Sequence, residues 1–242
     1  MKKAFTLAEV LITLGIIGIV AAMTLPTLMV KKRNSELESS FKTAYSLISL
    51  AVLRMSSDNP NIADTYCSLG SDGRNNYQFT EDFSKYFQTT RLYVKKTSSL
   101  TSLGYPKNSF LQANGKEVFN IDGHDEGAFF AKNGMMIAAG GCWWTRGTKE
   151  AVDFIVDTNG IKEPNRFGYD VFYFQINKNN ILLPSTHKYT FIEITSQLEQ
   201  CCNFKESSTC SITKDNGTAC SHFALKNQYP QDESKSYWKS LQ

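Results

Sequence analysis

The chain lacks the short motifs that mark common catalytic and metal-binding sites. Its 242 residues contain no GxSxG nucleophile elbow, no phosphate-binding P-loop and no GxGxxG dinucleotide fingerprint. No CxxC pair occurs, and the three histidines form no HxxxH pair, so the local spacing typical of a zinc site is missing. We therefore expect a protein that is not an enzyme, although a catalytic triad assembled from distant positions would leave no local motif.

A strong net charge is lacking as well. The 26 Lys and Arg residues nearly balance the 23 Asp and Glu residues, and the net charge of +3 gives no indication of a nucleic-acid partner. The hydrophobic share of 41% and the aromatic share of 12% suffice for one sizeable folded core beyond any membrane anchor.

The most informative segment is the first thirty residues. Positions 10–30 form an apolar run that is interrupted only by threonines, glycines and Pro26. As a helix with a rise of about 1.5 Å per residue, this run could span the ~30 Å hydrocarbon core of a bilayer. Glu9 lies at the entry to the run, and a carboxylate costs roughly 2.5–3.5 kcal/mol near the membrane centre. Because something must compensate that cost, Glu9 is a candidate functional residue.

The stretch AFTLAEVLI at positions 4–12 follows a start with two lysines. It resembles the processing and methylation motif of type IV pilins and type II secretion pseudopilins. In that family a prepilin peptidase cuts just before the Phe and methylates the new amine. The resemblance thus implies a leader of residues 1–4, a cut between Ala4 and Phe5, and methylation of Phe5. Ala4 stands where the family usually has glycine.

The resemblance also implies the fold, the function and the partners. It implies a pilin-like subunit of a type IV pilus or of a type II secretion filament, with residues 5–30 serving as membrane anchor and filament core. Glu9 would pair with the terminal amine of a neighbouring subunit. The implied partners are the prepilin peptidase, other pilin or pseudopilin subunits, an inner-membrane assembly platform and the lipid bilayer.

Other interpretations of the N-terminus stay open. An ordinary secretory signal cut near Ala22, or a plain uncleaved anchor, would make the protein a membrane-anchored extracytoplasmic binding module or enzyme. Basic residues flank the apolar run on both sides, so the positive-inside rule does not orient it. Cysteine usage and the motif favour a single pass through the bacterial inner membrane, with residues 31–242 outside the cytoplasm.

The six cysteines are even in number, which favours disulfides in an exported chain, with zinc as the alternative. They are Cys67, Cys142, Cys201, Cys202, Cys210 and Cys220. Cys201 and Cys202 should take different partners, because adjacent residues rarely meet disulfide geometry with each other. Our leading expectation joins Cys67 to Cys142 and pairs the other four within a tail formed by residues 196–242.

The rest of the chain predicts an α+β fold. Residues 31–58 continue the anchor as an amphipathic helix that should end near 57–59, because Pro60 disfavours helix before it. Its apolar face should pack on an antiparallel sheet within roughly residues 115–195; that face consists of Leu37, Phe41, Tyr45, Ile48 and Val52. Asn133-Gly134 predicts a hairpin between two of the strands. A short helix is expected over 80–87, with Thr80 as its N-cap.

Two further features have specific interpretations. Asp157 and Asn159 alternate around a glycine turn, and Asp170 could join them, as in oxygen-rich calcium loops. The alternative is a hairpin turn whose side chains bond their own backbone. Pro26 leaves the carbonyl of Ala22 without its helical partner. It therefore predicts a kink in the subunit and local melting of the helix in a filament.

Overall fold

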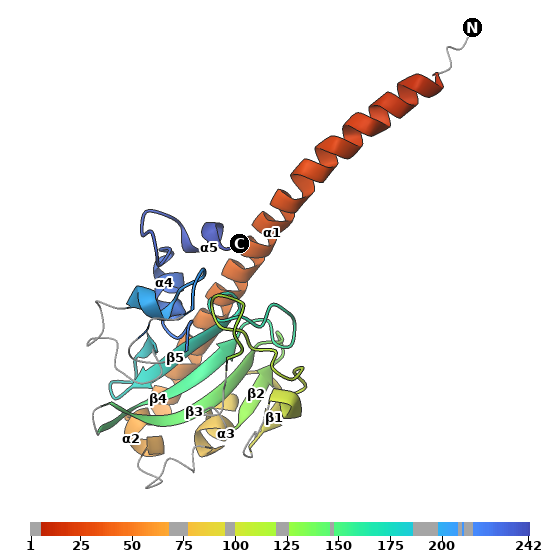
Figure 1. The fold of residues 1–242 in the computed structure, drawn as a ribbon. Coiled ribbons are helices and arrows are strands. Elements are labelled where there is room, and N and C mark those ends of the chain that lie inside the picture. Colours follow the sequence, from red (N-terminus) through yellow and green to blue (C-terminus); the bar gives the residue numbers. More distant parts are fainter. Residues whose placement is uncertain are drawn as a thin grey trace.

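The computed structural model describes residues 6–67, 77–94, 100–119, 126–145, 148–185, 198–207, 210 and 215–242, without the side chains of 100 and 141–150. Within these ranges the chain forms one long helix, α1 (Leu7–Asp58), and a head built around a six-stranded sheet. Figure 1 shows the first half of α1 projecting from the head and its second half lying along the sheet.

The end of α1 agrees with the prediction from Pro60. Asn59 adopts an extended conformation, and its N–H donates to the carbonyl of Met55 at 2.8 Å. This bond closes the last turn, after which a proline follows directly. Asn180 then fixes the exit of the chain, because its side-chain Nδ2 donates to the carbonyl of Pro60 at 2.9 Å.

The sheet has the order β1-β2-β3-β4-β5-β6, and every neighbouring pair is antiparallel. The strands are β1 (Thr89–Tyr93), β2 (Ala128–Ala131), β3 (Met136–Thr145), β4 (Thr148–Asp157), β5 (Val171–Asn177) and β6 (Leu182–Pro184). The predicted Asn133-Gly134 turn joins β2 to β3, with Gly134 at a φ of +92°. The sheet begins earlier than the sequence predicts, because β1 lies before residue 115.

The second half of α1 packs on one face of the sheet, which confirms the predicted α+β layers. Leu37, Phe41, Ile48 and Val52 are buried, and Tyr45 is partly buried against the same core. The ring of Phe41 meets that of Phe172 on β5 edge-on, with centroids 4.5 Å apart. Aromatic pairs of this kind add to the free energy gained by burying the apolar area itself.

The other face of the sheet is covered as well. Residues 100–119 supply Tyr105, Phe110 and Phe119, which pack with Phe130 and Tyr173 of the sheet into a second apolar cluster. The rings of Phe119 and Phe167 stack with centroids 4.1 Å apart. Strand β5 is therefore buried on both faces, which explains why its sequence is an almost continuous apolar run.

Short helices surround the sheet. They are α2 (Ile62–Cys67), α3 (Tyr77–Ser84), the 3-10 helices η1 (Leu100–Leu103) and η3 (Leu198–Cys201), α4 (Cys220–Lys226) and α5 (Tyr237–Ser240). The prediction of Thr80 as an N-cap is wrong. Thr80 lies inside α3, buried, and its hydroxyl donates to the carbonyl of Glu126 at 2.7 Å.

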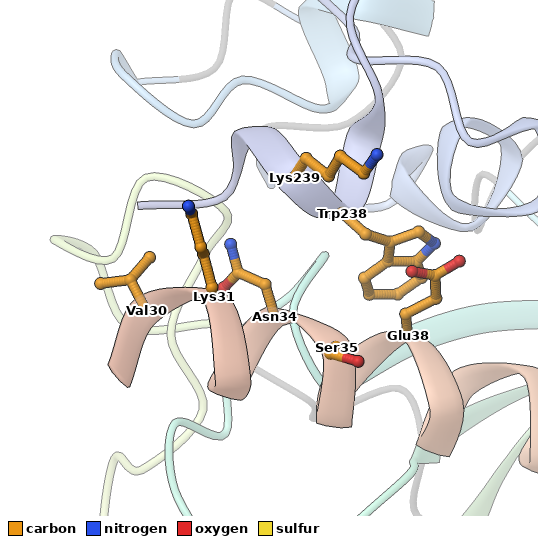
Figure 2. Close-up of a pocket in the computed structure, with 7 residues that line it drawn as sticks. All are labelled: Val30, Lys31, Asn34, Ser35, Glu38, Trp238 and Lys239. Carbon is orange, nitrogen blue, oxygen red and sulfur yellow. The ribbon is translucent and has the colours of Figure 1, made fainter. Parts of the chain in front are cut away.

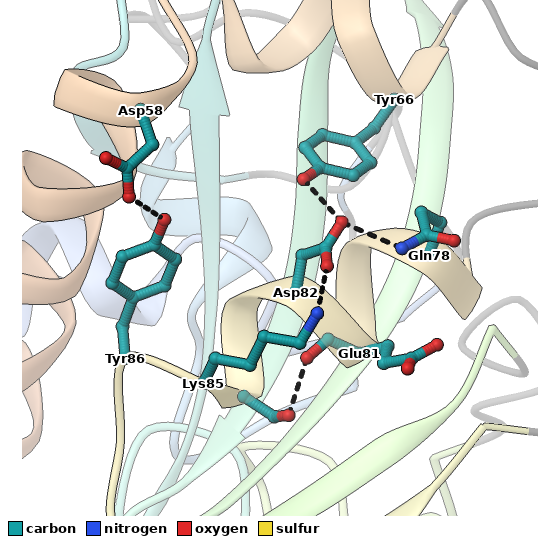
Figure 3. A network of polar contacts seen from close by, with 8 residues as sticks. Asp58, Tyr66, Gln78, Glu81, Asp82, Lys85 and Tyr86 are labelled. Carbon is teal, nitrogen blue, oxygen red and sulfur yellow. Dashed lines mark hydrogen bonds and ion pairs between the residues drawn. The ribbon is translucent and has the colours of Figure 1, made fainter.

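Polar contacts join α3 to its neighbours (Figure 3). Asp82 accepts from the hydroxyl of Tyr66 at 3.0 Å and pairs with Lys85 at 2.7 Å. The hydroxyl of Tyr86 donates to the carboxylate of Asp58 at the end of α1, at a distance of 2.5 Å. That bond, together with partial burial, raises the pKa of Tyr86 to about 12. These contacts fix α3 between α2 and the last turn of α1.

The tail contains two disulfides, Cys201–Cys210 and Cys202–Cys220. The two adjacent cysteines thus take different partners within the tail, as predicted from their spacing. Cys67 also belongs to a disulfide. The side chain of Cys142 lies outside the described residues, so the pairing of these two stays a prediction.

Candidate functional site: an exposed apolar helix and its first turn

The first half of α1 is apolar and nothing in the described chain covers it. Residues 7–30 are all exposed except the half-buried Ala21, and Leu7 and Met23 are exposed by 79% and 75%. These roughly 24 residues extend over about 36 Å. By length and composition this helix is able to cross a membrane. An apolar surface of this size requires lipid or other helices around it.

Glu9 is held in the first turn by Thr6. The backbone N–H and the hydroxyl of Thr6 each donate to Oε2 of Glu9 at 2.8 Å. The N–H of Glu9 donates back to the Thr6 hydroxyl at 3.3 Å. This capping box places the carboxylate at the positive end of the helix dipole. Thr6 was not among the predicted residues, although its spacing of three from a Glu is the signal of a capping box.

The other predicted residues of this segment have different outcomes. Ala4 and Phe5 lie outside the described residues, so the predicted cut and methylation stay predictions. Pro26 lies within α1, which is one uninterrupted helix across it (Figure 1). The helix therefore continues through the proline in the single subunit, and the predicted kink, which is a bend and not a break, stays a prediction. Local melting around Pro26 concerns a filament and stays a prediction.

The C-terminus lies against α1 where the exposed half ends. Nδ2 of the buried Asn34 donates to the carbonyl of Leu241 at 2.8 Å. Arg33 donates to Oδ1 of the same amide at 3.1 and 3.2 Å. Trp238 packs on Phe41 with ring centroids 5.2 Å apart. The last residues of the chain are therefore part of the base of the head.

The structure brings the predicted calcium ligands together. Asp157 and Asp170 are fully buried next to each other at the ends of β4 and β5, and Asn159 bonds to Asp170. Burial raises the pKa of Asp170 to about 7. Burial and, after it, repulsion from Asp170 raise the pKa of Asp157 well above its usual range. In the folded chain, burial and mutual repulsion therefore disfavour the state in which both carboxyl groups are ionised.

The contacts of the two carboxylates fit the hairpin-turn interpretation. Oδ1 of Asp157 accepts from the N–H groups of Asn159 and Gly160, and Oδ2 accepts from the hydroxyl of Tyr105 at 2.8 Å. Both oxygens of Asp170 accept backbone N–H groups in the turn that follows β4. All four oxygens thus accept hydrogen bonds from groups of the chain itself. Within the described ranges no three His, Cys, Asp or Glu side chains gather as a metal site would require.

The N-terminus of the chain matches one known family model. A family described as the prokaryotic N-terminal methylation motif matches residues 1–25. No curated protein and no solved structure matches the chain. The chain thus carries the prepilin-type signature of type IV pilins and pseudopilins. The signature and the long apolar helix together fit a membrane-anchored protein with a C-terminal head.

Proposed function

We propose that this protein is a structural subunit, a pilin or pseudopilin, of a type IV pilus-like or type II secretion filament. The observation that carries the proposal is the methylation motif directly in front of an apolar helix that the head leaves uncovered. Such a helix has two suitable environments, the bilayer before assembly and the apolar core of a filament after it.

The proposal assigns successive partners to the N-terminus. Prepilin peptidase removes residues 1–4 at the bacterial inner membrane and methylates Phe5. The head stays outside the cytoplasm, where disulfides such as Cys202–Cys220 form. The assembly platform then transfers the subunit into a filament. There the carboxylate of Glu9 leaves Thr6 and pairs with the amine of a neighbouring subunit, because an unpaired charge in an apolar core is costly.

A structural role also agrees with the chemistry of the head. Asp157 and Asp170, two carboxyl groups with raised pKa values, are fully buried and bonded to their own turns. A substrate would need access to such groups if they were catalytic. The proposed role therefore depends on assembly and not on a reaction in the head.

The decisive experiment determines the mature N-terminus. The full chain is expressed in a bacterium with active prepilin peptidase and in the same strain without it, extracted from membranes, and analysed by mass spectrometry. We expect a product that has lost Met-Lys-Lys-Ala and carries one added methyl group, leaving 242 − 4 = 238 residues, only in the strain with the enzyme. An intact Met1 in both strains would instead identify a membrane-anchored binding module or enzyme, and a cut near Ala22 in both strains would identify an ordinary secretory signal.

A deletion strain separates the two kinds of filament. Loss of surface pili on deletion indicates a pilus subunit, whereas loss of an exported protein with pili intact indicates a secretion pseudopilin. Complementation with the full chain is the control in both assays.

A further inference from the structure

A cavity of about 500 Å³ lies between residues 30–38 of α1 and the C-terminal helix α5. Figure 2 shows Trp238 and Lys239 of α5 opposite Lys31, Asn34 and Glu38 of α1. The wall on the α1 side is fixed, because both ends of the Asn34 amide are engaged by neighbours within the chain. The cavity is thus bounded by two elements that the Asn34 bond holds together.

The cavity lies at the end of the apolar half of α1. Val30, the last residue of that half, contributes to its lining, and Lys31 begins the polar half. When residues 7–30 fill a bilayer, Val30 and Lys31 lie at the level of the lipid headgroups. Trp238 lines the cavity further along α1, on the side of Glu38 and Phe41.

The chemistry of the cavity favours an anion. Lys31 and Lys239 are exposed, and neither pairs with a carboxylate in the part of the chain that the structure describes. The carboxylate that lines the cavity, Glu38, is neutralised by Lys42 at 2.6 Å. The indole N–H of the buried Trp238 has no hydrogen-bond partner in the described structure. Two ammonium groups and one unused N–H donor therefore border the same space.

We propose that this cavity binds the phosphate of an anionic phospholipid headgroup, with Lys31 and Lys239 as its ion-pairing groups. A lipid fits better than free phosphate, because the exposed apolar surface at Met29 and Val30 runs directly into the cavity and offers a path for the acyl chains. The inference rests on the membrane insertion that the proposed function includes. The site would fix the height and tilt of the head above the bilayer.

The test measures lipid binding to the full chain in a non-ionic detergent by native mass spectrometry. The probes are short-chain phosphatidylglycerol, phosphatidylcholine of the same chain length, and inorganic phosphate. The test variant is Lys31→Gln/Lys239→Gln. The matched control is Lys32→Gln/Lys235→Gln, which removes the same charge from lysines paired with Glu36 and Asp232. Lys32 lies beside Lys31 but does not line the cavity.

We expect one tightly bound phosphatidylglycerol per chain. Its affinity should fall about tenfold or more in the test variant, since each lysine near an anionic lipid contributes about 1 kcal/mol. Affinity should stay within about twofold of the original chain in the control. Equal affinity for both phospholipids, equal loss in both variants, or phosphate that binds as tightly as phosphatidylglycerol would each overturn the proposal.

The assay separates this inference from the proposed function, because it uses the unprocessed chain and needs no peptidase or filament. Selective lipid binding by a chain that is never cut or assembled would keep the lipid site and reject the pilin-like role. A processed and assembled chain without selective binding would reject the lipid site alone.

Discussion

The side-chain amide of Asn34 donates to the backbone carbonyl of Leu241 across 207 positions of sequence. Asn34 lies four residues after the apolar half of α1 ends at position 30. The bond therefore attaches the C-terminus to the helix next to the proposed membrane surface. Asn34 is buried, so its amide has lost its contact with water, and this hydrogen bond compensates the cost.

Replacing Asn34 should destabilise the head. Asn34→Ala leaves the carbonyl of Leu241 without its donor, and an unsatisfied buried group costs about 1–3 kcal/mol. Urea unfolding of the full chain in detergent, followed by tryptophan fluorescence, measures the change in unfolding free energy. The neighbouring exposed Ser35→Ala serves as the control and should stay within about 0.5 kcal/mol of the original chain. Equal stability of both variants would show that the bond has no net effect.

The roles of Glu9 in the capping box and in assembly can be separated. Glu9→Gln keeps a side chain that can cap the helix with Thr6, whereas Glu9→Ala does not. If the charge pairs with a neighbouring amine, both variants fold normally and both enter filaments poorly. Quantitative immunoblotting of sheared filaments measures incorporation, and disulfide formation reports folding of the head. Normal incorporation of Glu9→Gln would show that capping, and not charge, is what assembly requires.

Replacing Pro26 should stiffen the apolar half of α1. Pro26→Ala restores a backbone donor for the carbonyl of Ala22 and favours helix by up to about 3 kcal/mol. We expect slower amide hydrogen exchange in residues 20–30 of the micelle-bound chain and less extensible filaments. Gly15→Ala is the matched control, because an added Cβ there meets nothing within 4 Å. It should slow exchange less, by the roughly 1 kcal/mol that separates glycine from alanine.

The two tail disulfides should contribute unequally to stability. The Cys202–Cys220 bond closes a separation of 18 residues and the Cys201–Cys210 bond one of 9. Longer loops lose more entropy on closure, so Cys202→Ala/Cys220→Ala should lower the unfolding free energy by about 3 kcal/mol. Cys201→Ala/Cys210→Ala is the matched control and should have a smaller effect. Urea midpoints under oxidising conditions measure both, and the reverse order would contradict the loop argument.

The carboxyl pair in the head should make stability fall as pH rises. The pKa of Asp170 is about 7 in the folded chain and about 3.9 in an unfolded one, so the folded state binds more protons between these values. The unfolding free energy should therefore decrease from about pH 4 to about pH 7, by at most about 1.4 kcal/mol per pH unit for this group. Asp170→Asn should flatten the curve, measured as urea midpoints across that range.

His222 contributes the opposite slope and provides the control. Burial and, after it, the charge of Lys226 lower its pKa to about 4, so its contribution is lost as pH falls from about 6.5 to 4. Measuring Asp170→Asn in a His222→Gln chain isolates the carboxyl pair. Thermal melting with and without added calcium tests the calcium prediction separately: an ion held by Asp157 and Asp170 would raise the melting temperature, and Asp170→Asn would abolish that rise.

The elements that the sequence predicts correctly depend on residues that are neighbours in the chain. The end of α1 follows from Pro60, and the β2–β3 hairpin follows from Asn133-Gly134, because each depends on the conformations open to neighbouring residues. The apolar face of α1 is likewise visible in its spacing. The capping box at Thr6 and Glu9 is a local signal of the same kind, because it depends on two residues three positions apart.

Elements fixed by distant partners could not be predicted in this way. Thr80 has the residue type of an N-cap, but its hydroxyl bonds to Glu126 and the helix begins three residues earlier. Strand β1 is mostly exposed and gains its conformation by pairing with β2, where Tyr93 faces Ala128. No spacing rule connects Asn34 with Leu241. The position of the C-terminus, and hence the cavity, follows only from the folded arrangement.

The continuity of α1 has a mechanical consequence. No loop separates the apolar half from the half that packs on the sheet, so a pull or a torque on one end reaches the core of the head directly. The apolar half of the helix is uncovered, and we expect Pro26, which removes one backbone hydrogen bond, to make that half easier to deform. From Asn34 onward the helix is braced by the C-terminus and by the sheet. Under load we therefore expect residues 7–30 to bend and stretch while the head keeps its shape.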